Sequence, residues 1–176
     1  YCTVGGDNHR GGELATRHLV ERGCKRIAII GDWGTPEGLL RYEGYRSVLA
    51  AAGITPEPGL EITLDSARDS HREAALRLLA SGHRFDGLFC LSDAIAMAAI
   101  NALNEHGVSV PGDVAVVGYD DISLARYYTP SITTVYQDRE LGGRWLVDKL
   151  LRMIDGERVE SAFLTTEIIL RNSSQR

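Results

Sequence analysis

Short runs of β-branched and other apolar residues alternate along the chain with segments in which apolar residues recur every three or four positions. The apolar runs are Ile27–Ile30, Leu60–Leu64, Gly87–Leu91 and Val114–Val117. Continuous apolar runs of this length are typical of strands buried on both faces, and the segments between them have the period of an α-helix. The alternation predicts an α/β fold in which a parallel sheet is flanked by helices on both faces.

Three of the intervening segments carry clear apolar stripes, and we expect each stripe to pack on a sheet face. The stripes are Ala74, Ala75, Leu78 and Leu79; Ile95, Ala96, Ala99, Ile100 and Leu103; and Leu141, Trp145, Leu146, Leu150, Met153 and Ile154. A glycine follows each of five predicted helices, where it can adopt the left-handed conformation that ends a helix. These glycines are Gly23, Gly53, Gly82, Gly107 and Gly156.

Two segments do not fit a simple succession of strand and helix. A strand predicted around Tyr1–Val4 has no preceding unit with which to pair, and a helix predicted at Arg139–Asp155 follows a separate short strand at Ile132–Val135. We therefore expect the chain to begin and end in a second lobe that is only partly present.

The composition limits the classes of function. A chain of 176 residues with 44% hydrophobic residues can bury one sizeable core or two small lobes, and a net charge of -5 argues against a surface that neutralises many phosphates. Cys2, Cys24 and Cys90 lack the spacing of a zinc site, so reduced thiols are expected. Because no apolar run is long enough to span a bilayer, we expect a soluble, cytoplasmic protein without membrane contact.

The sequence contains none of the common catalytic motifs. It has no GxSxG, HExxH or GxxxxGK[ST] pattern, and the pairs Gly5-Gly6 and Gly11-Gly12 do not form GxGxxG between a strand and a helix. The five histidines lie in predicted loops and helix ends, where solvated histidine is usual. We expect no enzymatic activity, no cofactor and no metal site.

Several motifs occur along the chain in a fixed order. The most distinctive is VAVVGYDD at 114–121, continued by PSITTVYQD at 130–138, and RYEGY at 41–45 is a second. Shorter matches are Asp7-Asn8, Gly11-Gly12, His18-Leu19, RIAIIG at 26–31, Ser92-Asp93, Val110-Pro111 and Arg171–Ser173. In their order and spacing together, these motifs specifically resemble the sensor domain of LacI/GalR transcription regulators.

The resemblance implies a type I periplasmic-binding-protein-like fold, with two α/β lobes joined by crossover strands. Residues 26–135 would form the second, C-terminal lobe, while 1–25 and 136–160 would belong to a partial first, N-terminal lobe. Residues 161–176 would be a C-terminal strand and tail. Relative to the family pattern, the DNA-binding domain, the hinge and most of the first lobe are absent, so we expect a fragment.

The function implied by the resemblance is an allosteric sensor of a transcriptional repressor. A small polar effector, with a sugar as the leading candidate, would bind between the lobes and control operator binding by a helix-turn-helix domain outside this chain. The family precedent is a homodimer. One alternative is a periplasmic sugar-binding protein of an uptake system, which the sequence upstream of Tyr1 would distinguish. Another is a small α/β enzyme of flavodoxin-like shape.

Arg41 and Asp120 are the leading candidates for ligand contact. Both follow strands of the predicted sheet, and ligands of open parallel sheets bind beyond the carboxyl ends of the strands. A carboxylate at Asp120 suits two neighbouring hydroxyls, although Asp120 or Asp121 could instead stabilise a turn. Asp121 is expected to be structural. Arg41 near a helix N-terminus opposes the helix dipole unless an acceptor is supplied; its alternative is a solvated surface arginine.

Three further candidates lie after other strands. Ser92 and Asp93 open a predicted helix, where either can be the N-cap, and the resemblance implies that one of them also faces the ligand. Trp33 lies in the loop 31–38, where its ring can pack on the apolar face of a sugar or base, or simply against the loop.

The remaining candidates flank the predicted first lobe. The resemblance implies that Asn8 and Arg10 lie on that side of the cleft, although Asn8 could equally cap a helix that begins near Gly11. Arg139 follows the crossover strand and has the surface arginine as its alternative.

Overall fold

The computed structural model describes residues 2–65 and 69–175, and its main body is a six-stranded sheet with the order β3-β2-β4-β5-β6-β8. The strands are β2 (Ile27–Gly31), β3 (Glu61–Thr63), β4 (Gly87–Cys90), β5 (Ala115–Tyr119), β6 (Thr133–Gln137) and β8 (Thr166–Ile169). Neighbours pair in parallel, except that the edge strand β8 is antiparallel to β6. The predicted parallel sheet is therefore confirmed, with one antiparallel edge.

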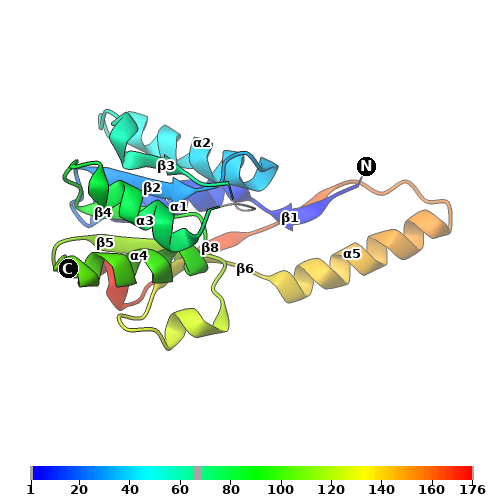
Figure 1. The fold of residues 1–176 in the computed structure, drawn as a ribbon. Helices are drawn as coiled ribbons and strands as arrows, with labels where there is room; N and C mark the ends of the chain where they lie inside the picture. Colours follow the sequence, from blue (N-terminus) through cyan, green and yellow to red (C-terminus); the bar gives the residue numbers. More distant parts are fainter. Residues whose placement is uncertain (1, 66–68, 176) are drawn as a thin grey trace.

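Four helices cover the two faces of this sheet: α1 (Asn8–Glu21), α2 (Pro36–Ala51), α3 (His71–Ala80) and α4 (Asp93–Glu105). Helix α1 packs beside α2, and α3 packs beside α4 on the opposite face (Figure 1). The two helix pairs lie on opposite faces because connections between parallel strands are right-handed. The chain moves outward from β2 through α2 to β3, then back through α3 and α4 to β4 and β5, so the connecting helices fall on opposite faces.

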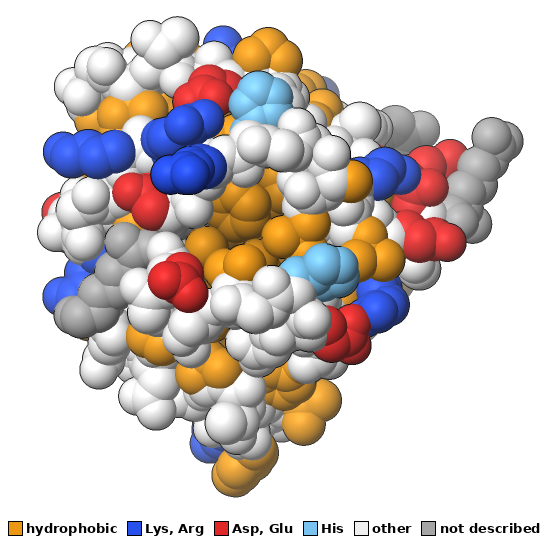
Figure 2. Space-filling view, turned by 60° about the vertical axis from the view of Figure 1, so that its left-hand side comes forward, with side chains coloured by type: hydrophobic (Ala, Val, Ile, Leu, Met, Phe, Trp, Pro, Cys, Tyr) orange, Lys and Arg blue, Asp and Glu red, His pale blue; other side chains and the backbone are white. Residues whose placement is uncertain are grey.

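Figure 2 shows the side of the body at the left of Figure 1, where β2, β4 and β5 begin. Acidic and basic side chains are interspersed there, around a hollow with a hydrophobic floor. On this face the described residues form no continuous basic surface, in line with the acidic net charge.

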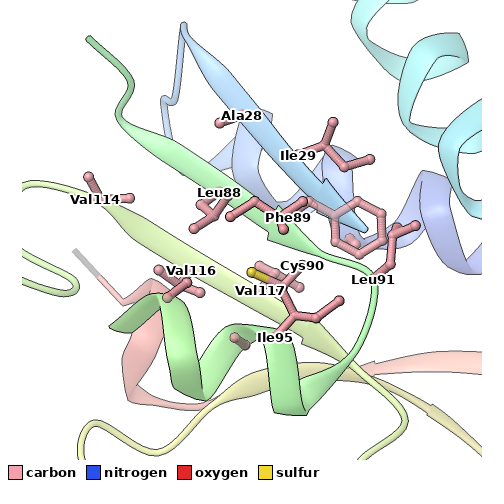
Figure 3. Packing of buried hydrophobic residues seen from close by; sticks show 14 of the residues in the cluster. Ala28, Ile29, Leu88, Phe89, Cys90, Leu91, Ile95, Val114, Val116 and Val117 are labelled. Atoms are coloured by element: carbon pink, nitrogen blue, oxygen red, sulfur yellow. The ribbon is translucent and has the colours of Figure 1, made fainter. Parts of the chain in front are cut away.

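The core lies between the sheet and its helices. Every residue of β2, β4 and β5 is buried. Figure 3 shows the side chains of these strands lying beside one another, with Ile95 of α4 pointing toward them. Burial on both faces explains why these strands are continuous apolar runs rather than alternating patterns.

The five predicted helix terminators are confirmed. Gly23, Gly53, Gly82, Gly107 and Gly156 all have positive φ angles, between 68° and 87°. Each follows the end of a helix, where a side chain at that position would be strained.

A smaller unit extends away from the main body (Figure 1). Strand β1 (Val4–Gly6) pairs in parallel with β7 (Ala162–Leu164), and α5 (Arg139–Ile154) contacts β1. No residue of α5 is buried. The prediction that its apolar stripe packs on a sheet face is therefore wrong for the described residues, because a sheet of two short strands cannot cover a helix of four turns. None of the described helices is long and apolar enough to cross a membrane.

Three crossover segments join the two sheets: 6–8 between β1 and α1, 137–139 between β6 and α5, and 164–166 between β7 and β8. We expected residues 1–25 to lie with the first lobe, but α1 packs on α2 and on the main sheet. Only β1 of that segment lies with α5. The difference arises because the hydrophobic pattern predicts that α1 is amphipathic but not which sheet its apolar face meets.

Helices α1 and α2 approach so closely that their backbones are in contact. A Cβ atom added to Gly44 would lie 2.2 Å from the carbonyl oxygen of His9, and one added to Gly12 would lie 2.1 Å from that of Arg41. Such distances are far below van der Waals contact, so two glycines set the spacing of the helix pair.

Replacing Gly44 with alanine should therefore force α1 and α2 apart and lower the free energy of unfolding by about 2 kcal/mol. The matched control is Gly143→Ala in α5, where an added Cβ meets nothing within 4 Å. Because glycine is a poor helix former, the control should leave stability unchanged or raise it by up to about 1 kcal/mol. Urea unfolding of the two variants measures the difference, and equal stabilities would contradict the close packing.

Candidate functional site

The candidate site lies beyond the carboxyl ends of β2, β4 and β5. Connections leave β2 in one direction and reach β4 from the other, and ligands of open α/β sheets bind at such a reversal. Arg41 of α2 reaches this edge, where its Nη1 donates to the carbonyl oxygen of Leu91 at 2.6 Å. Leu91 directly follows β4, and its own N–H donates to Ile30 of β2. The guanidinium thus lies between β2 and β4, where the order in which strands are added to the sheet reverses.

Three further groups surround the guanidinium of Arg41. Its Nε donates to Asn8 Oδ1 at 2.8 Å, and its Cζ lies 3.6 Å above the centre of the Tyr119 ring. Its Nη2 lies 3.7 Å from Asp120 Oδ1. The side chain is only 12% exposed, so the alternative of a solvated surface arginine does not describe it. The acceptors that its place in the helix requires are supplied by Asn8, Leu91 and Asp120.

Asp120 follows β5 and has a φ of 101°, a conformation that favours glycine. Its backbone N–H donates to Val135 at 2.8 Å, and its Oδ1 accepts from Gln137 Nε2 at 3.1 Å. One quarter of its side chain remains exposed. Asp121 is instead paired with Arg171 at 2.6 Å, which agrees with the structural role expected for it.

Sequence reasoning missed Gln137 as a member of this cluster. It is the last residue of β6 and lies within the 130–138 motif. The rule that selected Asp120, a polar residue at the carboxyl end of a strand, also applies to Gln137. Because the predicted strand ended at Val135, two residues too early, Gln137 was not expected at a strand end.

Ser92 and Asp93 have different structural roles. Ser92 is the N-cap of α4, and its Oγ accepts from the N–H of Ile95 at 3.3 Å. Asp93 is completely buried, and both of its carboxylate oxygens accept hydrogen bonds, from Thr134 Oγ1 at 2.6 Å and from the N–H of Ile122 at 2.9 Å. Burial is the largest cause that raises the pKa of Asp93, and the nearby charges of Asp120 and Asp121 act in the same direction. The two hydrogen bonds oppose them, and the net result is a pKa of about 6.

Trp33 packs against the helix that follows its loop. Its ring stacks on that of Tyr42 in α2, with a centroid separation of 4.8 Å, and the Tyr42 hydroxyl donates to Glu61 at 2.9 Å. The adjacent loop residues border a cavity of about 560 Å³ beyond the ends of β2 and β3. Its lining comprises Asp32, Gly34, Thr35, Thr63, Leu64, Asp65, Asp69 and Arg77.

Asn8 is the first residue of α1 and does not cap it. Asp7 is the N-cap, with Oδ1 accepting from the N–H of Arg10 at 2.9 Å. This corrects the alternative of a helix that begins near Gly11 with Asn8 as its cap. The buried Asn8 side chain is instead held by its donation to Gly6 and by accepting from Arg41. A cavity of about 290 Å³ lies beside it, lined by Gly6, Asp7, Asn8, His9, Leu40 and Phe163.

Arg10 and Arg139 do not join the cluster around Arg41. Arg10 is exposed and pairs with Glu13 at 2.9 Å on the same helix. Arg139 is exposed at the start of α5. The structure therefore brings together Asn8, Arg41 and Asp120, and adds Gln137 and Tyr119 to them.

The cluster combines a cation, a partly exposed carboxylate and two amides. Charge-assisted hydrogen bonds of this kind suit a ligand with several neighbouring hydroxyl groups. Among the residues that the structure describes, no group of three or more His, Cys, Asp or Glu side chains is placed to hold a metal ion.

The profile of one protein family, described as a periplasmic binding protein-like domain, matches residues 16–174. The chain belongs to this family. The matched residues include the whole six-stranded sheet and the crossover segments 137–139 and 164–166. The type of fold predicted from the sequence is confirmed.

The chain is also similar to curated transcription regulators. It is 37% identical over 175 residues to the HTH-type transcriptional repressor PurR of Haemophilus influenzae, covering 95% of this chain and 52% of that protein. It is 36% identical over 166 residues to the ribose operon repressor of Escherichia coli, covering 93% of this chain and 50% of that protein. The chain spans about half the length of the relatives it matches.

Solved structures of LacI-family regulators superpose closely on this periplasmic binding protein-like domain. The complex of the transcriptional regulator CelR with cellobiose has a TM-score of 0.92 and 38% identity, covering 98% of this chain and 54% of that one. The lac repressor dimer bound to operator has a TM-score of 0.90 and 28% identity, with 98% and 60% covered. The resemblance to LacI/GalR regulators is therefore confirmed, and these relatives are regulators rather than enzymes.

The buried Asp93 predicts a specific pH dependence of stability. Its pKa rises from 3.8 to about 6 on folding, so between these values the folded state holds a proton that the unfolded chain releases. This group therefore stabilises the fold progressively as the pH falls from about 6 to about 4, by up to about 3 kcal/mol. Asp93→Asn should remove that gain, measured by urea unfolding at pH 7.5 and pH 4.5.

Asp69→Asn is a control of opposite sign, because the hydrogen bond from Arg77 holds the pKa of Asp69 below its usual value. The contribution of Asp69 to the free energy of unfolding is therefore lost, rather than gained, as the pH falls. A pH profile for Asp93→Asn that parallels the unchanged protein would contradict the raised pKa of Asp93.

Proposed function

We propose that this chain is the effector-sensing part of a LacI/GalR-type transcriptional repressor. A small polar ligand, with a sugar as the leading candidate, binds at Arg41, Asp120, Asn8 and Gln137. Its binding controls operator recognition by a helix-turn-helix domain outside this chain. The observation that carries the proposal is the convergence of these four side chains at the carboxyl edge of the sheet, beside the crossover segments.

The position of the cluster supports an allosteric role. Asn8 lies at the end of one crossover segment and Gln137 at the start of another. A ligand that contacts both touches the chain segments on which the relative orientation of the two lobes depends. If it binds one orientation more tightly, it shifts the population toward that orientation, with a typical coupling of about 1 to 3 kcal/mol.

The other candidates have a smaller part in this proposal. Ser92 caps α4 at the same edge of the sheet and can contribute its hydroxyl, while Trp33 can contribute a ring face at the loop 31–38. We propose Arg10 and Arg139 only as contacts on the first-lobe side, since both are exposed.

We propose that β1, β7 and α5 are part of a first lobe and that the main sheet is the second lobe. The exposed apolar side chains of α5 support this, since Leu146, Leu150 and Ile154 are more than half exposed. Parallel sheets are normally covered on both faces, and a sheet of two strands is not stable alone. Further strands that extend β1 and β7 would cover α5.

The regulator is favoured over a sugar-binding protein of an uptake system because the similar curated proteins are repressors. We further propose a cytoplasmic homodimer; a dimer is the assembly named for the lac repressor structure. The acidic net charge supports operator contact through another domain.

The test is a thermal-shift screen of the full-length protein against sugars, including cellobiose and ribose, and against sugar phosphates and nucleosides. A ligand that binds only the folded state raises its stability by RT ln(1 + [L]/Kd). Arg41→Ala and Asp120→Asn should each weaken binding of the active compound by at least about tenfold, because each removes a charged partner. Asparagine is chosen at Asp120 because it tolerates positive φ.

Arg46→Ala is the matched control, since Arg46 lies on the same helix but pairs with Glu61 at 2.9 Å, outside the cluster. It should bind the compound as the unchanged protein does. Normal affinity in the Arg41 and Asp120 variants would contradict the proposed site. If no compound raises the melting temperature of the full-length protein, the proposal of a sugar ligand is contradicted.

A further inference from the structure

Asp93 joins three elements that are separate in the sequence. It opens α4, and its carboxylate accepts from Thr134 on the crossover strand β6 and from Ile122 in the loop after β5. The approach is close, since a Cβ atom added to Gly118 of β5 would lie 2.2 Å from Asp93 Oδ1. The start of α4 can therefore reach these partners only because β5 has a glycine at that position.

The loop that Asp93 holds is the one that carries Asp120. Asp120 and Asp121 have φ angles of 101° and 45°, and strained residues of this kind persist only where their surroundings hold them. The N–H of Asp121 donates to Thr134 Oγ1 at 3.3 Å, and the Thr134 hydroxyl in turn donates to Asp93. Two consecutive N–H groups of the loop are thus bound to Asp93, one directly and one through Thr134.

A carboxylate suits this position because both of its partners are donors. It only accepts hydrogen bonds, whereas an asparagine would present one donor group. The charged groups around it are the carboxylates of Asp120 and Asp121, which face Arg41 and Arg171 respectively, and the Cys90 thiol lies beside it. Its burial and its two internal hydrogen bonds leave neither oxygen directed toward a ligand.

We propose that Asp93 is a positioning residue, which fixes the Asp120–Ile122 loop on the crossover strand β6 and thereby directs Asp120 toward Arg41 and Gln137. It does not itself contact the ligand. The proposal deepens the proposed function, because Asp120 is the ligand contact that Asp93 would orient.

The first test needs no ligand. Backbone amide exchange and side-chain NMR of the full chain are compared for the unchanged protein, Asp93→Ala and Thr134→Val. Both variants should speed the exchange of the Asp121 amide by at least about tenfold, and Asp93→Ala should do the same for the Ile122 amide. Both should shift the side-chain amide resonance of Gln137, which reports the place of Asp120. Thr134→Ser keeps the hydroxyl and should restore the original values.

Asp86→Ala is the matched control. Asp86 also accepts backbone N–H groups, those of Lys25 and Arg26, but at the opposite end of the sheet. It should leave Asp121, Ile122 and Gln137 unchanged. Unaltered exchange in both Thr134→Val and Asp93→Ala would overturn the proposal, as would an equal shift of Gln137 in Asp86→Ala. If Asp93→Ala does not fold, Thr134→Val and Thr134→Ser decide the question.

A second test separates positioning from general stabilisation, with cellobiose as the probe. If Asp93 acts through Asp120, Asp93→Ala should weaken binding about tenfold alone but add little to Asp120→Asn. If the double variant instead loses affinity by the product of the two single losses, the positioning role is overturned. If cellobiose does not bind the unchanged protein, cellobiose is excluded as the effector of the proposed function. The exchange measurements still decide the role of Asp93.

Discussion

The guanidinium of Arg41 connects parts of the chain that are far apart in the sequence, and the geometry of the candidate site follows from its contacts. It bonds to Asn8 at the start of α1 and to Leu91 beyond β4, and it lies over the ring of Tyr119 at the end of β5. These contacts require α1 and α2 to lie side by side, and the glycines at 12 and 44 allow that spacing. A cation held by three elements at once has little rotational freedom, so the ligand binding proposed above would require no further ordering of this side chain.

The same region contains features that cost stability. A carboxylate is buried at Asp93, and the two residues after β5 have positive φ angles. Such features are costly in an ordinary loop and are found where the surrounding structure holds them for a function. Here they occur together at the edge of the sheet where the crossover segments meet, beside the pair that Asp120 forms with Arg41.

The two ends of the molecule differ in how completely they are packed. The main sheet has helices on both faces and a continuous core, whereas α5 lies beside a sheet of two strands, has no buried residue and leaves most of its apolar side chains exposed. Amphipathic helices are stable mainly through the surface they cover, so α5 has the sequence of a packed helix without the neighbours that would pack on it. The crossover segments thus connect a sheet that is covered on both faces to a two-stranded sheet that is not.

The sequence by itself determined most of the secondary structure, because strand burial and helix termination depend on short-range patterns. Continuous apolar runs predicted β2, β4 and β5, and glycines predicted where helices end. It also singled out Arg41 and Asp120, through their positions after strands and through motif resemblance. Only the tertiary structure decided which side chains meet. It placed α1 on the main sheet, left α5 uncovered, made Asp7 the cap in place of Asn8, and added Gln137. Asp93, a ligand candidate in the sequence, is buried against Thr134 and Ile122. These outcomes depend on pairings between residues more than a hundred positions apart in some cases, such as Asn8 and Tyr119, and local patterns carry no information about such distances.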